Sequence, residues 1–121
     1  MRVAVIGSRQ LHIENLEHYL PSGTTEIISG GAKGVDMCAK KYAIEKNLTL
    51  TEFLPEYEKY GRAAPLKRNI TIVENADIVI AFWDKQSRGT KFVIDYCRKN
   101  SIPLLLYTLS TDSGEYILDN T

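Results

Sequence analysis

Short apolar runs that alternate with helical patterns constrain the fold of this chain more than any other feature. Residues 3–6 form a continuous apolar run that stops at Gly7, and residues 76–83 form a longer run that is apolar apart from Asp77. Such runs are typical of strands that are covered on both faces, as in a parallel sheet. Strands that alternate with helices indicate βα units. The sequence therefore predicts an α/β fold with a Rossmann-like, three-layer α/β/α arrangement.

The predicted strands fix a topology as well as a fold class. They cover residues 3–6, 26–29, 48–54, 76–83 and 103–107. Because crossovers between parallel strands are right-handed, we expect a mostly parallel, five-stranded sheet in the order 3-2-1-4-5. The third strand contains more polar residues than the others, which favours an edge position. Residues 1–107 form the predicted domain, and the tail 108–121 is either a loose extra strand or without regular structure.

Helices are expected between these strands because apolar residues recur at helical spacing. The expected apolar faces, in chain order, are Ile13, Leu16 and Leu20 in a short helix; Val35, Cys38, Ala39, Tyr42 and Ala43; Leu66, Ile70 and Val73 after Pro65; and Val93, Tyr96 and Cys97 in a helix over residues 90–99.

Charge and cysteine content exclude several classes of protein. Lys and Arg number 15, as do Asp and Glu, so the formal charge is zero and a protein that mainly coats nucleic acid or anionic membrane is not expected. No apolar run approaches the ~20 residues of a membrane span, and the apolar start is too short for a signal peptide. Cys38 and Cys97 lack partners at metal-ligand spacing, which predicts reduced thiols, no metal and a cytoplasmic location.

Three loops that follow predicted strands are rich in glycine, hydroxyl groups and cations. Their residues are Gly7, Ser8 and Arg9; Gly30, Gly31, Ala32, Lys33 and Gly34; and Ser87, Arg88, Gly89 and Thr90. Glycines let backbone N–H groups approach a phosphate, and a helix N-terminus adds partial positive charge. The alternative is that the glycines only permit tight turns, with Ser and Thr as helix caps. Three such loops at the carboxyl ends of parallel strands favour a phosphate-bearing ligand.

Further candidates have a structural alternative beside the functional one. Asp36 either favours a positive helix end or accepts hydrogen bonds from a sugar. Arg68 and Asn69 lie off the predicted apolar face, so they belong either to a solvated helix face or to the wall of a site. Three aromatic residues either pack near strand ends or stack on a base: Tyr57, Tyr60 and Trp83.

These motifs, in this order, resemble the SLOG superfamily. It includes the Rossmann domain of Smf or DNA-processing protein A, the LOG cytokinin-activating enzymes, and small bacterial or phage proteins related to YspA and YpsA. The likeness covers residues from about 1 to 107 and rests on Gly-Ser-Arg at 7–9, Gly-Gly-Ala-Lys-Gly-Val-Asp at 30–36, Arg-Asn at 68–69 and Ser-Arg-Gly-Thr at 87–90. The resemblance implies binding of nucleotides or of signals derived from them, such as ADP-ribose-like molecules.

The LOG enzymes suggest an alternative, hydrolysis of the N-glycosidic bond of a nucleotide. Arg68 takes the place of their arginine, and Gly89-Thr90 matches part of their glycine-rich motif. Their glutamate falls at Val93, which can neither donate nor accept a proton. If the chain is an enzyme, Arg68 would act together with one carboxylate. The candidates are Asp36, Asp84 and Asp95.

DNA-processing protein A suggests a second alternative, the binding of single-stranded DNA. This chain shares its Gly-Ser-Arg, Gly-Gly-Ala and Arg-Asn elements, but the neutral charge offers no basic track for a strand. We therefore expect a module that binds or senses a small nucleotide ligand such as AMP or ADP-ribose, without an established cofactor. Phosphates would lie on the loops 30–34 and 87–90, with residues 7–9 as the floor and Arg68-Asn69 as the wall. The sequence leaves a homodimer open.

Overall fold

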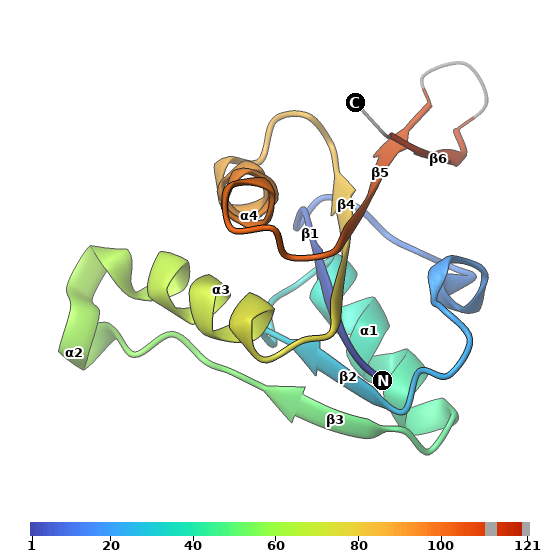
Figure 1. Cartoon of the computed structure of the whole chain (residues 1–121), viewed down its shortest axis with the longest axis horizontal. Coiled ribbons are helices and arrows are strands. Elements are labelled where there is room, and N and C mark those ends of the chain that lie inside the picture. The colour runs from blue at the N-terminus through green and yellow to red at the C-terminus, as the bar shows by residue number, and fades with distance from the viewer. Residues whose placement is uncertain (111–113, 120–121) are drawn as a thin grey trace.

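The computed structural model describes residues 1–110 and 114–119, and it is built on one sheet in the order β3-β2-β1-β4-β5-β6 (Figure 1). The strands are β1 (Arg2–Gly7), β2 (Glu26–Ser29), β3 (Thr49–Glu52), β4 (Ile78–Trp83), β5 (Leu104–Leu109) and β6 (Tyr116–Leu118). The first five are parallel, which confirms the predicted order, and β3 lies at an edge. The sheet has six strands rather than the five predicted for residues 1–107, because β6 in the tail adds an antiparallel strand beside β5.

Helices cover both faces of the sheet, so the Rossmann-like three-layer arrangement is confirmed (Figure 1). They are η1 (Leu16–Tyr19), α1 (Val35–Glu45), α2 (Tyr57–Tyr60), η2 (Gly61–Ala63), α3 (Ala64–Glu74) and α4 (Arg88–Lys99). α1 packs on one face, and α3 and α4 pack on the other. Within the described residues, no helix is both long and apolar enough to cross a membrane.

The alternation of side chains along β1 builds both halves of the core. Val3 and Val5 point toward the α1 face, whereas Ala4 and Ile6 point toward α3 and α4. All four are nearly inaccessible to solvent, as expected of a central strand between two helical layers. Phe82 of β4 anchors the α1 side, where it packs against an aromatic cluster that contains Tyr19, Tyr107 and Tyr116.

Two helix predictions need correction. The short helix before residue 21 is only the single 3₁₀ turn η1, although Ile13 and Leu16 are buried as expected. The predicted apolar face of α3 was wrong at Leu66, which is exposed. Val73 is buried as predicted, and Ile72, which was not part of the predicted face, is buried beside it.

The chain beyond residue 107 is partly in the sheet. β5 runs on to Leu109, and β6 pairs with it through Tyr107–Leu118 and Leu109–Tyr116. A three-residue antiparallel strand carries too little periodicity to be identified from sequence. Residues 111–113 and 120–121 of the predicted tail lie outside the described residues.

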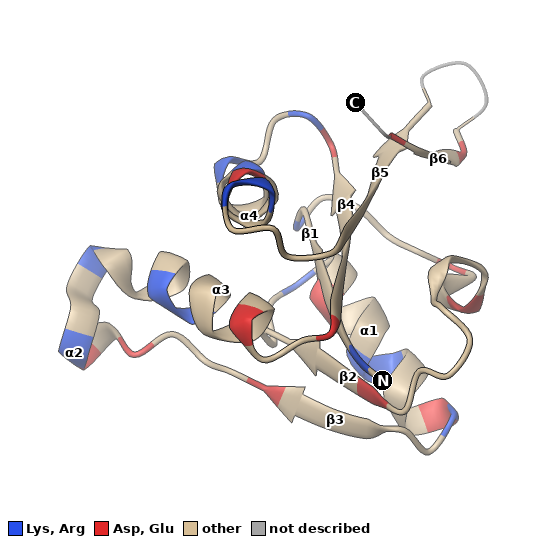
Figure 2. Ribbon diagram, viewed as in Figure 1, with Lys and Arg blue, Asp and Glu red and all other residues tan. Residues whose placement is uncertain are grey.

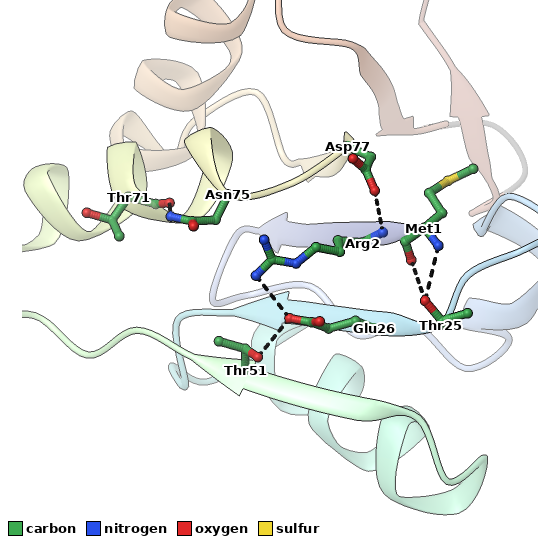
Figure 3. Close-up of polar contacts among 8 residues, drawn as sticks. All are labelled: Met1, Arg2, Thr25, Glu26, Thr51, Thr71, Asn75 and Asp77. Atoms are coloured by element: carbon green, nitrogen blue, oxygen red, sulfur yellow. Dashed lines mark hydrogen bonds and ion pairs between the residues drawn. The ribbon is translucent and has the colours of Figure 1, made fainter.

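A polar network closes the end of the sheet at which its parallel strands begin (Figure 3). Glu26 of β2 pairs with the Arg2 guanidinium at 3.2 Å and accepts a hydrogen bond from the Thr51 hydroxyl at 2.8 Å. The Arg2 backbone N–H donates to the Asp77 carboxylate at 2.7 Å. The network therefore joins β1, β2, β3 and the segment before β4, and the contacts with Thr51 and Arg2 lower the pKa of Glu26.

We predict that Glu26→Gln destabilises the protein and weakens the acid dependence of its stability. Since the folded-state pKa lies below the usual 4.5, the Glu26 carboxylate contributes stability that is fully present above that pH. The contribution is lost as pH falls through the lowered pKa. The expected loss in the free energy of unfolding is about 1 kcal/mol at neutral pH, measured by urea denaturation. Asp95→Asn is the control, because the Lys91–Asp95 pair is exposed and should contribute less than about 0.5 kcal/mol; equal losses would contradict the prediction.

Candidate functional site

A cavity of about 420 Å³ opens at the carboxyl ends of the parallel strands, on the side of α3 and α4. It lies where β1 and β4 are neighbours but lead into opposite helical layers, the position at which open α/β sheets bind ligands. Its lining is Ile6, Gly7, Arg9, Gln10, Gly30, Ala32, Asp36, Pro65, Leu66, Arg68, Asn69, Ile72, Asp84, Gln86, Ser87, Gly89 and Thr90.

The cavity brings together members of all three predicted loops and of the Arg68-Asn69 pair. The predicted site residues that line it are Gly7, Arg9, Gly30, Ala32, Asp36, Arg68, Asn69, Ser87, Gly89 and Thr90. The structure places six others outside its lining: Ser8, Gly31, Lys33, Gly34, Trp83 and Arg88. Gln10 and Gln86 were missed by the sequence analysis, because a lone glutamine in a loop has no diagnostic spacing.

Two of the loop glycines are required for packing between loops. A Cβ atom on Gly7 would overlap the Val35 side chain at the start of α1. Gly34 has a φ of +71°, and a Cβ there would lie 2.5 Å from the backbone oxygen of Arg9. Glycine at these positions lets the loop after β1 rest directly on the N-terminus of α1, which sets the backbone position of Arg9 at the cavity.

Gly30 and Gly31 differ in what a side chain would meet. A Cβ on Gly30 would lie 2.5 Å from Nη1 of Arg68 and 3.1 Å from Oδ2 of Asp36. Gly31 has a φ of +70°, and its Cβ would face Glu52 and Leu54 instead. Gly30 is therefore the glycine that makes room at the cavity, and Gly31 is a turn glycine.

Arg68 reaches from α3 across to the end of β2. Its Nη1 donates to the Gly30 carbonyl at 2.8 Å and more weakly to the Phe53 carbonyl at 3.5 Å. Its Nε donates to Oδ1 of Asn69 at 2.8 Å, so the neighbouring amide orients the guanidinium. Both residues are half-buried and line the cavity, so they do not belong to a fully solvated helix face. Burial lowers the pKa of Arg68, and the nearby Asp36 charge opposes that shift.

Asp36 is a nearly buried carboxylate at the start of α1. Its side chain accepts the Ala32 N–H at 3.1 Å. Burial raises the pKa of Asp36, while the Ala32 N–H and the charges of Arg68 and Arg9 act in the opposite direction. A carboxylate with a raised pKa beside two arginines in a cavity is typical of functional sites.

The loop into α4 is held rigid by its own polar groups. Oδ1 of Asp84 accepts the backbone N–H groups of Gln86 at 2.8 Å and Ser87 at 2.7 Å. Ser87 caps the helix by accepting the Thr90 N–H at 3.3 Å. Burial alone would raise the pKa of Asp84, but these backbone N–H groups outweigh it and the pKa is lowered. The helix therefore presents its N-terminal turn to the cavity in a fixed position.

Three remaining candidate positions take part in packing or in hydrogen bonds outside the cavity. Trp83 donates its indole N–H to the Ser87 carbonyl at 3.0 Å, so it supports the α4 loop from outside the cavity. Val93 is fully buried against the sheet, and Asp95 is exposed and paired with Lys91. The position of the LOG glutamate thus carries no group that can transfer a proton. Among the described residues, no group of three or more His, Cys, Asp or Glu is arranged to hold a metal ion.

We predict opposite pH dependences for two cavity carboxylates. Since burial raises the pKa of Asp36 above its usual 3.8, the folded protein loses stability as pH rises from there through the raised pKa. Asp36→Asn cannot ionise, so its free energy of unfolding relative to wild type should increase between about pH 3 and pH 7, by on the order of 1 kcal/mol. Asp84→Asn should change in the other direction, because the pKa of Asp84 is lowered. Urea denaturation across this range measures both, and slopes of the same sign would refute the assignment.

Comparison with known proteins identifies the family. A family model described as DNA recombination-mediator protein A matches residues 1–91, which extend from β1 into the first turn of α4 and include every loop at the cavity. Neither curated proteins nor solved structures gave a match. The family match confirms the resemblance to the SLOG superfamily and its Smf-related branch. The chain belongs to the DNA recombination-mediator protein A family.

Proposed function

We propose that this chain binds a nucleotide or a nucleotide-derived phosphate in the cavity between β1, α3 and α4. The observation that carries the proposal is the convergence of two guanidinium groups and a helix N-terminus on one cavity: Arg9, Arg68 and the first turn of α4 all line it. A guanidinium group can bind two phosphate oxygens at once through two parallel hydrogen bonds. A helix N-terminus adds backbone N–H donors and partial positive charge.

The phosphate would lie against the N-terminus of α4. Nothing lies within 4 Å of a Cβ built on Gly89, so an anion can approach the backbone there without displacing a side chain. Arg9 is exposed at the rim and free to close on a ligand, whereas Arg68 is fixed by its hydrogen bond to Gly30. A fixed and a movable cation thus face the same space.

The rest of the cavity fits a sugar and a base. Asp36 offers carboxylate oxygens as hydrogen-bond acceptors to sugar hydroxyl groups. Because Asp36 is nearly buried, few water molecules have to leave its carboxylate when a ligand binds. Ile6, Ile72 and Leu66 supply apolar surface beside these polar groups. A volume of about 420 Å³ lies in the range of small-molecule sites, which combine apolar walls with a few oriented polar groups.

A second candidate, binding of a single-stranded nucleic acid, is favoured by the family match and by a basic surface next to Arg68. Nζ of Lys59 and Nζ of Lys67 lie 5.1 and 5.9 Å from the centre of the Tyr60 ring. Figure 2 shows basic residues along α2 and the first half of α3. A second cavity of about 310 Å³ lies there and shares Arg68 with the first. Cations beside an exposed ring suit a strand whose bases stack, although the overall charge is zero.

We predict that Arg9→Ala weakens binding of AMP, ADP or ADP-ribose by about tenfold, the effect of losing one charge-assisted contact of roughly 1.4 kcal/mol. Lys33→Ala is the matched control, since Lys33 is an exposed cation of the facing loop that does not line the cavity. Calorimetric titration gives the affinities. Fluorescence of Trp83, the single tryptophan, reports on the α4 loop through its hydrogen bond to Ser87.

The outcomes separate the two candidates. Equal affinities of the two variants, or no response to any of the three compounds, would contradict a nucleotide site in this cavity. Binding of oligothymidylate that is lost in Lys67→Ala, without binding of free nucleotides, would support the second candidate. Chromatography after long incubation should recover intact AMP, because Val93 occupies the place of a catalytic glutamate.

A further inference from the structure

A cysteine and a histidine lie together on the α1 side of the sheet, away from the cavity beside α3 and α4. Sγ of Cys38 in α1 is 3.4 Å from Nδ1 of His12, which precedes η1 in the chain. The backbone N–H of Ile13 also donates to this sulfur at 3.4 Å. The Tyr116 hydroxyl donates to the His12 carbonyl at 3.1 Å, so β6 holds the histidine segment in place.

The two cysteines, both predicted to be reduced thiols, differ in their surroundings. Cys97 is fully buried, and burial raises its pKa to about 11. Cys38 is only partly buried, and it lines a cavity of about 260 Å³ together with His12. The remaining charged groups at this cavity are Glu14, Lys41 and Glu45.

We propose that Cys38 is a nucleophilic thiol, with His12 as its proton acceptor, and that it forms a mixed disulfide with a small zwitterionic disulfide. Thiolates, not thiols, attack disulfides, and reactive cysteines lie in partly exposed places beside cationic groups or helix N-termini. Cys38 lies in the first turns of α1, next to His12 and one helical turn from Lys41. His12 thus places an imidazole nitrogen 3.4 Å from the sulfur.

The exchange is balanced without a further oxidant. Nδ1 of neutral His12 accepts the proton of the Cys38 thiol, and Sγ attacks one sulfur of the small disulfide. The new Sγ–S bond forms as the original S–S bond breaks, and the other half leaves as a thiolate. Lys41 offers a cation for a carboxylate of the bound half, and Glu14 or Glu45 offers an anion for its ammonium group.

The test uses the full chain with glutathione disulfide at neutral pH and follows adduct mass with time. We expect one adduct per chain, retained in Cys97→Ala and absent in Cys38→Ala. His12→Asn should slow the reaction about tenfold, since the thiol loses its proton acceptor. His18→Asn is the matched control, because His18 is also exposed and does not line this cavity. Thermal unfolding shows that each variant is folded.

Two results would overturn the proposal. One is a His12→Asn protein that reacts as fast as the wild type. The other is a Cys38 that reacts no faster in the folded protein than in urea. Neither result depends on nucleotide binding, because Cys38 and His12 lie outside the lining of the cavity at Arg68.

Discussion

The hydrogen bond from Arg68 to the Gly30 carbonyl is the interaction on which the site depends. It spans 2.8 Å and joins α3 to the end of β2, elements from different layers of the fold. The guanidinium passes so close to Gly30 that any side chain there would displace it. Asp36 provides the compensating charge for a half-buried cation. One glycine, one arginine and one carboxylate therefore define the wall and the electrostatics of the cavity together.

The charged side chains at the two ends of the sheet differ in whether they form direct ion pairs. At the end where the strands begin, Glu26 is paired with Arg2 and hydrogen-bonded to Thr51, as in a structural network. At the opposite end, within residues 1–110 and 114–119, the ion pairs do not include Arg9, Asp36 or Arg68. Charges that lie near one another at a cavity without direct ion pairs leave contacts available to a ligand. Within the described residues, the ion pairs thus do not use the charged side chains that line the cavity.

Much of the architecture follows from local sequence patterns, and the details of the site do not. Buried parallel strands appear as apolar runs and their crossovers have one hand, so the order of the first five strands was predictable. The loops at their carboxyl ends indicated the position of the cavity for the same reason. The choice of Gly30 over Gly31 depends on backbone torsion and on what lies opposite each Cα, neither of which has a sequence signal. The contact of Cys38 with His12 arises only when residues 26 apart are brought together by packing on the sheet.

The proposed site holds a nucleotide phosphate between the loop after β2 and the N-terminus of α4. The most direct measurement is a titration of isotope-labelled protein with AMP, followed by the backbone amide resonances of the chain. We predict saturable shifts at Gly30, Gly89 and Thr90, which line the cavity, and unchanged resonances at Cys38 on the other side of the sheet. Saturable shifts confined to residues outside this cavity, or none at millimolar AMP, would contradict it.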